Sequence, residues 1–560
     1  MMAFKVLVLL LIALVGKSQQ RSQPSDSTYY AGVVEHMEAP ASITSPRSRT
    51  IYISNEFQRI IASEEAKDLD IIVFPEHVTN YKETASFVPH GSQNVTPCYQ
   101  TDYDLLLIEI SCAARAQGIY VVINLIEKEI CANGSGSDTF DPCPAQGIRY
   151  FNTNVVFDRS GRVISRYRKT HLWRQEYDSR SVLRQPDVAT FATDFGVTFG
   201  HFICFDMLFY EPAMVLVRDL NITDIIYPTF WFSELPFLTA LQLQEGWSFG
   251  NNVNLLAADA SDPAGKTTGS GIYAGRWGRL QAEIFAQPTT RLMTARVPKK
   301  DRVQQLGDQV EELFTPQLIT PRMTGVDTYR DYNVDIFETV LLEADFLEVT
   351  QNLCHGTFCC DFSVKRALTP GDITADHLTY RYRLAAYWGD ETTVIRVDRS
   401  EQAVCAIFAC KDANLLSCGS IFPASGGQVA NKHHFTEIKI NATFPAAPRG
   451  RRLIMPSTLD GGFKPIAVSK FDWEETPAPA AKNPDKETRV SLNLIRPQND
   501  LLTFAIWANY YTDLASSHNL DHMQPTTEGV AVPTTPTSGA SSIVLTSAGF
   551  LVLISLVYQF

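Results

Sequence analysis

Three residues that could carry out acyl transfer stand directly after strand-like runs of the chain. Glu76 follows Ile-Val-Phe-Pro, Lys169 follows Val-Ile-Ser-Arg-Tyr-Arg, and Cys204 follows Gly-His-Phe-Ile. An α/β sheet presents polar groups to a crevice at the carboxyl ends of its strands, so these side chains could meet. The carboxylate could take the thiol proton, the thiolate could attack a carbonyl carbon, and the ammonium could stabilise the resulting oxyanion. We therefore take the three as candidate catalytic residues.

Each of these residues has a plainer explanation when it is taken alone. A lone cysteine in an apolar run often packs as a small core residue, Glu76 could cap a helix, and most lysines are solvated. Their shared placement after strands and the odd number of cysteines favour the chemical interpretation.

The eleven cysteines separate by position into groups that can pair. They are Cys98, Cys112, Cys131 and Cys143, then Cys204 alone, then Cys354, Cys359, Cys360, Cys405, Cys410 and Cys418. Four and six are even numbers, so Cys204 is left over. In an oxidising compartment, an unpaired thiol is either buried and inert or kept free for chemistry. Three pairings of the first group and fifteen of the second remain open.

The composition is that of a folded, acidic protein. The chain has 560 residues, of which 45% are hydrophobic and 19% are charged, and its net charge is −13. This mixture excludes disorder for most of the length. The acidic balance argues against a nucleic-acid partner, because phosphates attract basic surfaces. At roughly 150 residues per domain, we expect two large domains, or three.

The pattern of hydrophobic and polar residues changes near residue 300. Residues 29–300 alternate β-branched runs with helical patterns, which predicts an α/β domain with layered sheets. Its helices include one that begins at Thr101 and stops at Gly118, and one over residues 235–249. Residues 301–513 alternate in period two and contain six cysteines, which predicts a second, β-rich, disulfide-stapled domain.

Both ends of the chain indicate export. Residues 1–18 combine Lys5 with a run of ten apolar residues and small residues for cleavage, which is typical of a signal peptide. Residues 543–560 are apolar to the end and carry no Lys or Arg. They follow small residues at Ser538 and a Pro/Thr-rich stalk over residues 521–542. This order predicts a GPI-signal tail (543–560) that is removed when the lipid is attached at Ser538. The alternative is a membrane protein embedded by its tail.

Four Asn-X-Ser/Thr sites agree with export through the secretory pathway. They begin at Asn94, Asn133, Asn221 and Asn441. In a secreted chain such sites are candidates for glycosylation on surface loops. We therefore expect an extracellular glycoprotein on the outer face of the cell membrane, attached to the membrane by its GPI lipid.

The local sequences around the three candidates are more specific than the residues themselves. They are Phe-Pro-Glu at 74–76, Tyr-Arg-Lys-Thr-His-Leu at 167–172 and Phe-Ile-Cys-Phe-Asp-Met-Leu-Phe at 202–209. In this order they resemble the Glu, Lys and Cys motifs of the nitrilase (carbon–nitrogen hydrolase) superfamily. Further segments look like its vanin and biotinidase branch: Tyr-Pro-Thr-Phe-Trp at 227–231, Leu-Pro at 235–236, Thr-Gly-Ser-Gly-Ile-Tyr at 268–273 and the Cys359-Cys360 pair. The resemblance covers nearly the whole chain between its two end segments.

The resemblance implies an α/β fold, the αββα nitrilase sandwich, with the β-rich domain packed on it. It implies Glu76 as general base, Lys169 as oxyanion stabiliser and Cys204 as nucleophile. The amide N–H of Phe205 would be a second oxyanion donor.

Three further positions of the resemblance concern the surroundings of these residues. Glu176 matches a glutamate that helps to hold the lysine and the water, and Trp231 matches a wall of the substrate pocket. Phe230, also in the pocket, stands where better-known members of the branch have alanine, and Ser233 stands where they have asparagine. These two departures leave the shape of the acyl pocket open.

The predicted function is hydrolysis of a linear amide through a thioester on Cys204. The resemblance implies pantetheine as the substrate, giving pantothenate and cysteamine. The alternatives are a biotinyl amide such as biocytin, or a catalytically idle ectodomain that binds or adheres. We expect no metal and no organic cofactor, because His433 and His434 lack zinc-site spacing and no dinucleotide or phosphate loop motif occurs. His171 is expected to be a structural hydrogen-bond partner.

Overall fold

The computed structural model describes residues 21–131, 139, 141–305, 323–370, 377–390, 400–423, 427–447, 451–477 and 487–511. The predicted signal peptide, stalk, tail, lipid-attachment residue Ser538 and glycosylation site Asn133 lie outside these residues. Among the described residues, no helix is both long and apolar enough to cross a membrane.

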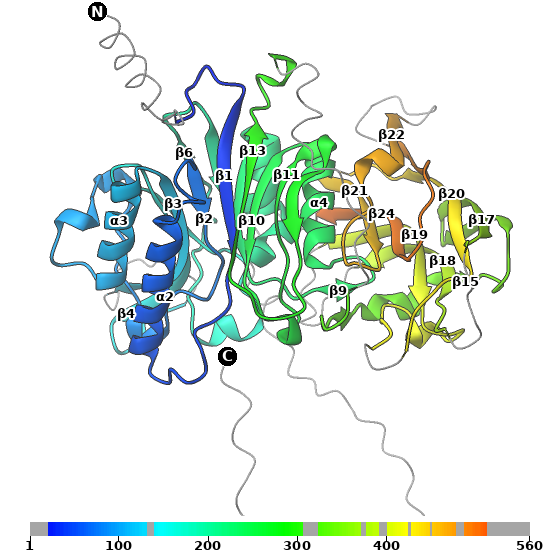
Figure 1. The fold of residues 1–560 in the computed structure, drawn as a ribbon, viewed down its shortest axis with the longest axis horizontal. Coiled ribbons are helices and arrows are strands. Elements are labelled where there is room, and N and C mark those ends of the chain that lie inside the picture. Colours follow the sequence, from blue (N-terminus) through cyan, green and yellow to red (C-terminus); the bar gives the residue numbers. More distant parts are fainter. Residues whose placement is uncertain are drawn as a thin grey trace, which may run out of the picture.

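Two six-stranded sheets face each other in the first part of the chain (Figure 1). The first sheet has the order β13 (Arg291–Pro298), β1 (Thr28–Glu35), β2 (Ile71–Val73), β3 (Tyr120–Ile130), β4 (Ile148–Phe157) and β5 (Val163–Arg168). The second has the order β12 (Arg279–Glu283), β11 (Ser270–Ala274), β10 (Asn254–Asp259), β8 (Asp224–Thr229), β7 (Thr198–His201) and β6 (Ala189–Ala192). Their inner faces share one apolar core, which includes Val33, Val73, Ile226 and Leu256.

Helices cover the outer faces of both sheets. The helices α2 (Pro46–Ile61) and α3 (Leu105–Gln117) pack on the first sheet, and α4 (Ala240–Asn251) packs beside the second (Figure 1). Strand β2 shows how alternation separates the two cores. Ile72 packs in the core under α2 and α3, whereas Ile71 and Val73 face the other sheet. The predicted αββα sandwich is confirmed.

Two helices begin later than the sequence predicts. The helix α3 is capped at Asp104 rather than at Thr101, although it ends at Gly118, whose φ of 65° is left-handed, as predicted. The helix α4 begins at Ala240 rather than at residue 235. Leu235 instead belongs to a short strand, β9 (Glu234–Leu235), that pairs with β14 (Tyr329–Arg330).

The second part of the chain is a pair of five-stranded antiparallel sheets. One has the order β15 (Glu338–Leu341), β18 (Arg381–Asp390), β19 (Ser400–Cys410), β24 (Leu501–Tyr511) and β21 (Arg452–Asp460). The other has the order β16 (Glu348–His355), β17 (Phe358–Leu368), β20 (His433–Phe444), β23 (Thr488–Leu494) and β22 (Phe471–Pro477). The predicted β-rich second domain is confirmed.

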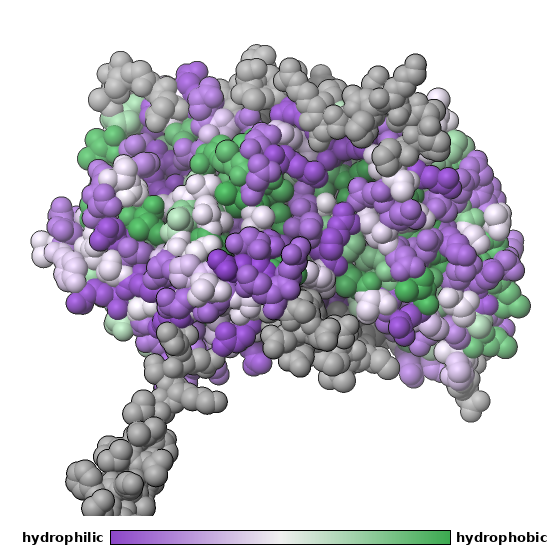
Figure 2. Space-filling view, turned by 90° about the horizontal axis from the view of Figure 1, so that it is seen from above, coloured by the Kyte–Doolittle hydropathy of each residue, from purple (hydrophilic) through white to green (hydrophobic). Residues whose placement is uncertain are grey.

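The second part packs closely on the first through α4 and β21 (Figure 1). Gly246 and Gly250 of α4 make this approach possible. A Cβ atom at Gly246 would lie 2.8 Å from the carbonyl oxygen of Pro456, and one at Gly250 would lie 2.9 Å from that of Ile454. Glycine costs helix stability, and here it allows the helix to pack directly against the strand backbone. The face of the molecule in Figure 2 is hydrophilic over most of its area, with apolar residues in separate groups.

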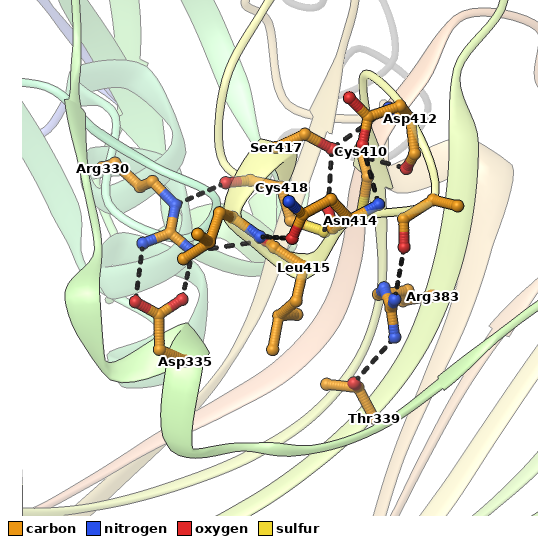
Figure 3. Close-up of a disulfide and its surroundings, with 12 residues drawn as sticks. Arg330, Asp335, Thr339, Arg383, Cys410, Asp412, Asn414, Leu415, Ser417 and Cys418 are labelled. Carbon is orange, nitrogen blue, oxygen red and sulfur yellow. Dashed lines mark hydrogen bonds and ion pairs between the residues drawn. A yellow bond between two sulfur atoms is a disulfide. The ribbon is translucent and has the colours of Figure 1, made fainter.

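All cysteines except Cys204 form disulfides. The pairs are Cys98–Cys112, Cys131–Cys143, Cys354–Cys359, Cys360–Cys405 and Cys410–Cys418. The Cys410–Cys418 loop also holds the chain segment that joins the two parts. Arg330 Nε donates to the Cys418 carbonyl at 2.8 Å, and Arg330 also pairs with Asp335 (Figure 3).

The Cys360–Cys405 bond is expected to stabilise the protein more than any of the shorter loops of the second domain. It joins β17 to β19, and therefore one sheet to the other, across 45 residues. By loop entropy, the variant with alanine at both positions should lose about 4 kcal/mol, against about 2 kcal/mol for the Cys354–Cys359 pair, whose separation is five residues. Urea denaturation measures both losses, and equal shifts of the midpoint would contradict the argument.

Candidate active site

The first two candidate residues follow strands of the first sheet. Glu76 lies just beyond β2, and Lys169 follows directly on β5. Both side chains are almost fully buried. Lys169 Nζ donates to Glu76 Oε1 at 2.8 Å, although 93 residues separate them in sequence. The strand-end placement therefore brings the carboxylate and the ammonium into direct contact.

Cys204 lies at a sharp turn between β7 and a short helix (Cys204–Leu208). Its φ of 47° is left-handed, which is uncommon for a residue other than glycine. Asp206 holds the turn, because its Oδ2 accepts from the amide of Ile203 at 3.1 Å and from the hydroxyl of Tyr167 at 2.7 Å. Strained turns of this kind present nucleophiles at the end of a strand.

The thiol of Cys204 and the carboxylate of Glu76 both bind the backbone of the loop that follows β8. Cys204 Sγ donates to the carbonyl oxygen of Phe230 at 3.6 Å, and the amide of Phe230 donates to Glu76 Oε2 at 2.9 Å. One residue thus fixes the position of both the carboxylate and the sulfur. The structure brings Glu76, Lys169 and Cys204 together in the lining of a single cavity of about 290 Å³.

Glu176 is the second carboxylate on Lys169. It lies on a short helix (Arg174–Asp178), and its Oε2 accepts from Lys169 Nζ at 2.7 Å and from the amide of Trp173 at 2.8 Å. Burial alone would raise the pKa of Glu176, but Lys169 holds it below its ordinary value. Burial alone would lower the pKa of Lys169, but Glu176 and Glu76 raise it well above 10.5. The lysine is therefore an ammonium fixed between two carboxylates.

The resting thiol is protonated. Burial raises the pKa of Cys204 well above its ordinary value, the charge of Glu76 raises it further, and Lys169 offsets only part of the effect. For this sulfur to act as a nucleophile, a base would have to take its proton, and Glu76 is the carboxylate whose charge acts on the thiol.

The remaining predicted residues divide between the cavity and its support. Phe205, Phe230 and Trp231 line the cavity. Two hydrogen bonds hold Trp231 in place. Its amide donates to Asp259 Oδ1 at 3.0 Å, and its indole N–H donates to the carbonyl of Leu238 at 2.9 Å. Ser233 does not line the cavity: its hydroxyl accepts from the amide of Ala240 at the start of α4.

His171 lies outside the cavity lining and binds the turn that carries Cys204. Its Nδ1 lies 3.0 Å from Asp206 Oδ1, and its ring stacks on Phe209 at 3.5 Å between centroids. The described residues hold no group of histidine, cysteine and carboxylate side chains that could bind a metal ion.

Asn152 is a site residue that the sequence analysis did not find. It lies in β4, and its Nδ2 donates at 2.7 Å both to Glu76 Oε1 and to Glu176 Oε1. Its Oδ1 accepts from Asn124 Nδ2 at 2.7 Å. The amide thus connects the two carboxylates that hold Lys169. The available signal was an asparagine pair, Asn152 and Asn154, at alternate positions just before the apolar run at 155–157.

Comparison with known proteins shows the family of the chain. Residues 12–250 match the carbon-nitrogen hydrolase family, and residues 326–514 match the vanin C-terminal domain. Vanin-like protein 1 of Drosophila melanogaster is 39% identical over 522 residues, which are 90% of each chain. The chain is a vanin-like member of the nitrilase superfamily. Human pantetheinase is 29% identical to this vanin-like protein over 418 residues, which cover 70% of this chain and 76% of that enzyme.

The enzyme class follows from the family. This vanin-like protein is a carbon–nitrogen hydrolase, with pantetheinases among its relatives. Those relatives and the disulfides are consistent with an extracellular protein.

Replacing Asn152 with alanine is expected to lower kcat/KM by about 10- to 100-fold, because misplaced reacting groups cost this much. The amide donates to both carboxylates, and alanine leaves Glu76 and Glu176 without it. Asn152→Asp should lose more, since a third carboxylate would repel the other two. Steady-state kinetics checks both variants, and wild-type rates for Asn152→Ala would show that the amide positions nothing.

Proposed function

We propose that this vanin-like protein hydrolyses a linear amide through a thioester on Cys204, and that pantetheine is the substrate. The observation that carries the proposal is that a buried ammonium in contact with a carboxylate lines the same cavity as an unbridged thiol. The pantetheinase relatives support the choice of substrate.

The first half of the reaction forms the thioester. Glu76 takes the proton of Cys204 as the sulfur attacks the amide carbon, and negative charge develops on the amide oxygen. Lys169 and the amide N–H of Phe205 stabilise this oxyanion. Glu76 then gives its proton to the amide nitrogen, the carbon–nitrogen bond breaks, and cysteamine leaves.

The second half of the reaction returns the enzyme to its resting state. Glu76, again a carboxylate, takes a proton from water as the water oxygen attacks the thioester carbon. The carbon–sulfur bond breaks, pantothenate leaves, and the proton returns to the sulfur. Glu176 and Asn152 keep Lys169 and Glu76 in place through both halves.

The location of the protein is part of the same proposal. We place it outside the cell, exported by residues 1–18 and anchored by a GPI lipid at Ser538. The exposed positions of Asn94 and Asn221 support glycosylation at these two residues, and Asn441 is half-buried. Phospholipase release from intact cells would test the anchor, and retention of all the protein on the membrane would contradict it.

A direct assay separates the proposed substrate from its alternative. The purified ectodomain is incubated with pantetheine and with biocytin, and the released cysteamine and lysine are quantified. Turnover of pantetheine with a kcat/KM at least tenfold above that of biocytin is the expected result. A higher kcat/KM for biocytin would identify a biotinyl amide as the substrate. If neither compound were hydrolysed, the proposal of pantetheine as the substrate would be contradicted.

A further inference from the structure

A second, small cavity adjoins the larger one that Glu76, Lys169 and Cys204 line. It has a volume of about 10 Å³, and most of its lining residues are polar. The two cavities share part of their walls, because His77 and Arg180 line both. We call the smaller one the polar cavity. Its lining consists of His77, Thr79, Asn80, Asn124, Leu125, Ile126, Asn152 and Arg180.

One buried hydroxyl in the lining of the polar cavity has no partner in the protein. Thr79 is fully buried, and its Oγ1 makes no hydrogen bond within the described part of the chain. A buried hydroxyl without a partner is costly, and native proteins commonly satisfy such a group with a bound water. A cavity of about this volume accommodates one water molecule. The hydroxyl of Thr79 therefore indicates a water site.

Neighbouring side chains supply the further partners that a buried water needs. Asn124 Oδ1 accepts from the amide of His77 at 3.0 Å, and Asn152 Oδ1 accepts from Asn124 Nδ2 at 2.7 Å. Each of these oxygens has a second lone pair, so a water that accepts from Thr79 Oγ1 could donate to either. The larger cavity is less suited to hold a single water, because aromatic side chains form much of its wall.

Two short connections relate the polar cavity to the carboxylate of Glu76. Thr79 follows Glu76 in one tight turn, in which the amide of Val78 donates to the carbonyl of Glu76 at 3.0 Å. Asn152 lies in the wall of the polar cavity, and its Nδ2 donates to Glu76 Oε1 at 2.7 Å. A water in the polar cavity is therefore within one side chain of the group that would activate it.

We propose that Thr79 holds the water molecule that hydrolyses the Cys204 thioester. This inference deepens the proposed function and rests on the thioester given there. Once the amine has left, the water passes His77 and Arg180 into the larger cavity. Its oxygen bonds to the thioester carbon, one of its protons goes to Glu76, the carbon–sulfur bond breaks, and the proton returns to the sulfur. A water held at Thr79 favours hydrolysis over transfer of the acyl group to another acceptor.

Competition between water and hydroxylamine tests the proposal on the full-length protein. Hydroxylamine is larger than water and does not fit the polar cavity, so it attacks the thioester from the larger cavity alone. Thr79→Val keeps the shape of the side chain and removes the hydroxyl. In this variant we expect the ratio of hydroxamate to acid to rise at least threefold, together with the acylated fraction of Cys204. Thr79→Ser keeps the hydroxyl and should stay within twofold of wild type. A rise of less than threefold in Thr79→Val overturns the proposal.

Thr50→Val is the matched control for removing a buried threonine hydroxyl. Thr50 Oγ1 lies 2.8 Å from Thr84 Oγ1, and neither residue lines the larger cavity or the polar cavity. The ratio of hydroxamate to acid should therefore stay at the wild-type value. An equal rise in Thr50→Val and Thr79→Val would show a general effect of lost hydroxyls and would overturn the proposal.

A high-resolution crystal structure tests the water site without any substrate. An ordered water within hydrogen-bonding distance of Thr79 Oγ1 in the wild type, absent from Thr79→Val, supports the proposal, and a wild-type map without this water overturns it. The competition uses pantetheine and biocytin in turn. If only biocytin acylates Cys204, the pantetheine proposal fails while the result for Thr79 stands. If neither compound acylates Cys204, the thioester mechanism fails, and the role of the water fails with it.

Discussion

Replacing Cys204 with alanine is expected to lower kcat by at least about four orders of magnitude, which is the scale of losing a catalytic nucleophile. Without the sulfur, no thioester forms. Glu76 and Lys169 remain in contact with each other, but the methyl group of alanine at position 204 cannot attack an amide. Release of the amine and the acid from the candidate amides measures the loss. Turnover near the wild-type rate would contradict the mechanism.

The same variant is expected to fold. The thiol donates a weak hydrogen bond to the carbonyl of Phe230, and the left-handed φ of position 204 strains alanine and cysteine alike. The thermal midpoint should therefore move by only a few degrees. Cys204→Ser is the companion variant, because it keeps a hydroxyl in place of the thiol. A large drop in the midpoint of both variants would show that Cys204 serves the core instead.

Mass spectrometry gives this prediction a positive signal. Wild-type protein mixed with an amide substrate and rapidly quenched should carry the acyl group on the peptide that contains Cys204. Cys204→Ala should carry none. An acyl group found on another residue of the wild-type protein would identify that residue as the nucleophile in place of Cys204.

Much of the fold was predictable because it depends on patterns local to the chain. Alternation in period two marked the β-rich second part, and β-branched runs between helical patterns marked the sandwich. The grouping of the cysteines identified Cys204 as the unpaired one without any knowledge of pairing. The pairs themselves were not predictable, since the Cys360–Cys405 bond depends on how one sheet packs on another.

What the sequence could not predict depends on contacts distant in the chain. The expected helix over residues 235–249 begins late because Leu235 pairs with Arg330, which lies about a hundred residues further along. Asn152 lies in no recognised motif, and only the folded chain shows that it contacts Glu76 and Glu176. The three candidate residues were accessible because each follows closely on a strand, two in the first sheet and one in the second, and polar groups at strand ends face a common crevice.

Lys169→Met is expected to be among the most destabilising single substitutions in the protein. The side chain of Lys169 is 1% exposed, and its Nζ lies 2.8 Å from Glu76 and 2.7 Å from Glu176. Methionine would leave two buried carboxylates without their cation, which costs about 3–5 kcal/mol. Lys128→Met is the matched control, because Lys128 pairs with Asp104 in a partly exposed position and should cost about 1 kcal/mol or less. Activity should also fall by about 100- to 1000-fold, the usual loss for one oxyanion donor.

The pH dependence of the same comparison identifies the cause. Lys169 holds the pKa of Glu176 below 4.5, so this carboxylate contributes stability that is present above 4.5 and is lost as the pH falls through its folded pKa. Glu176 and Glu76 raise the pKa of Lys169 above 10.5, so the contribution of the lysine is complete below that pH and is lost only as the pH rises further. The gap in urea midpoint between wild type and Lys169→Met should therefore be widest near neutral pH and should narrow below about pH 4.5. A gap that stays constant down to about pH 3 would mean that Lys169→Met destabilises the protein through lost packing, and the ammonium would then have no electrostatic part in holding the site together.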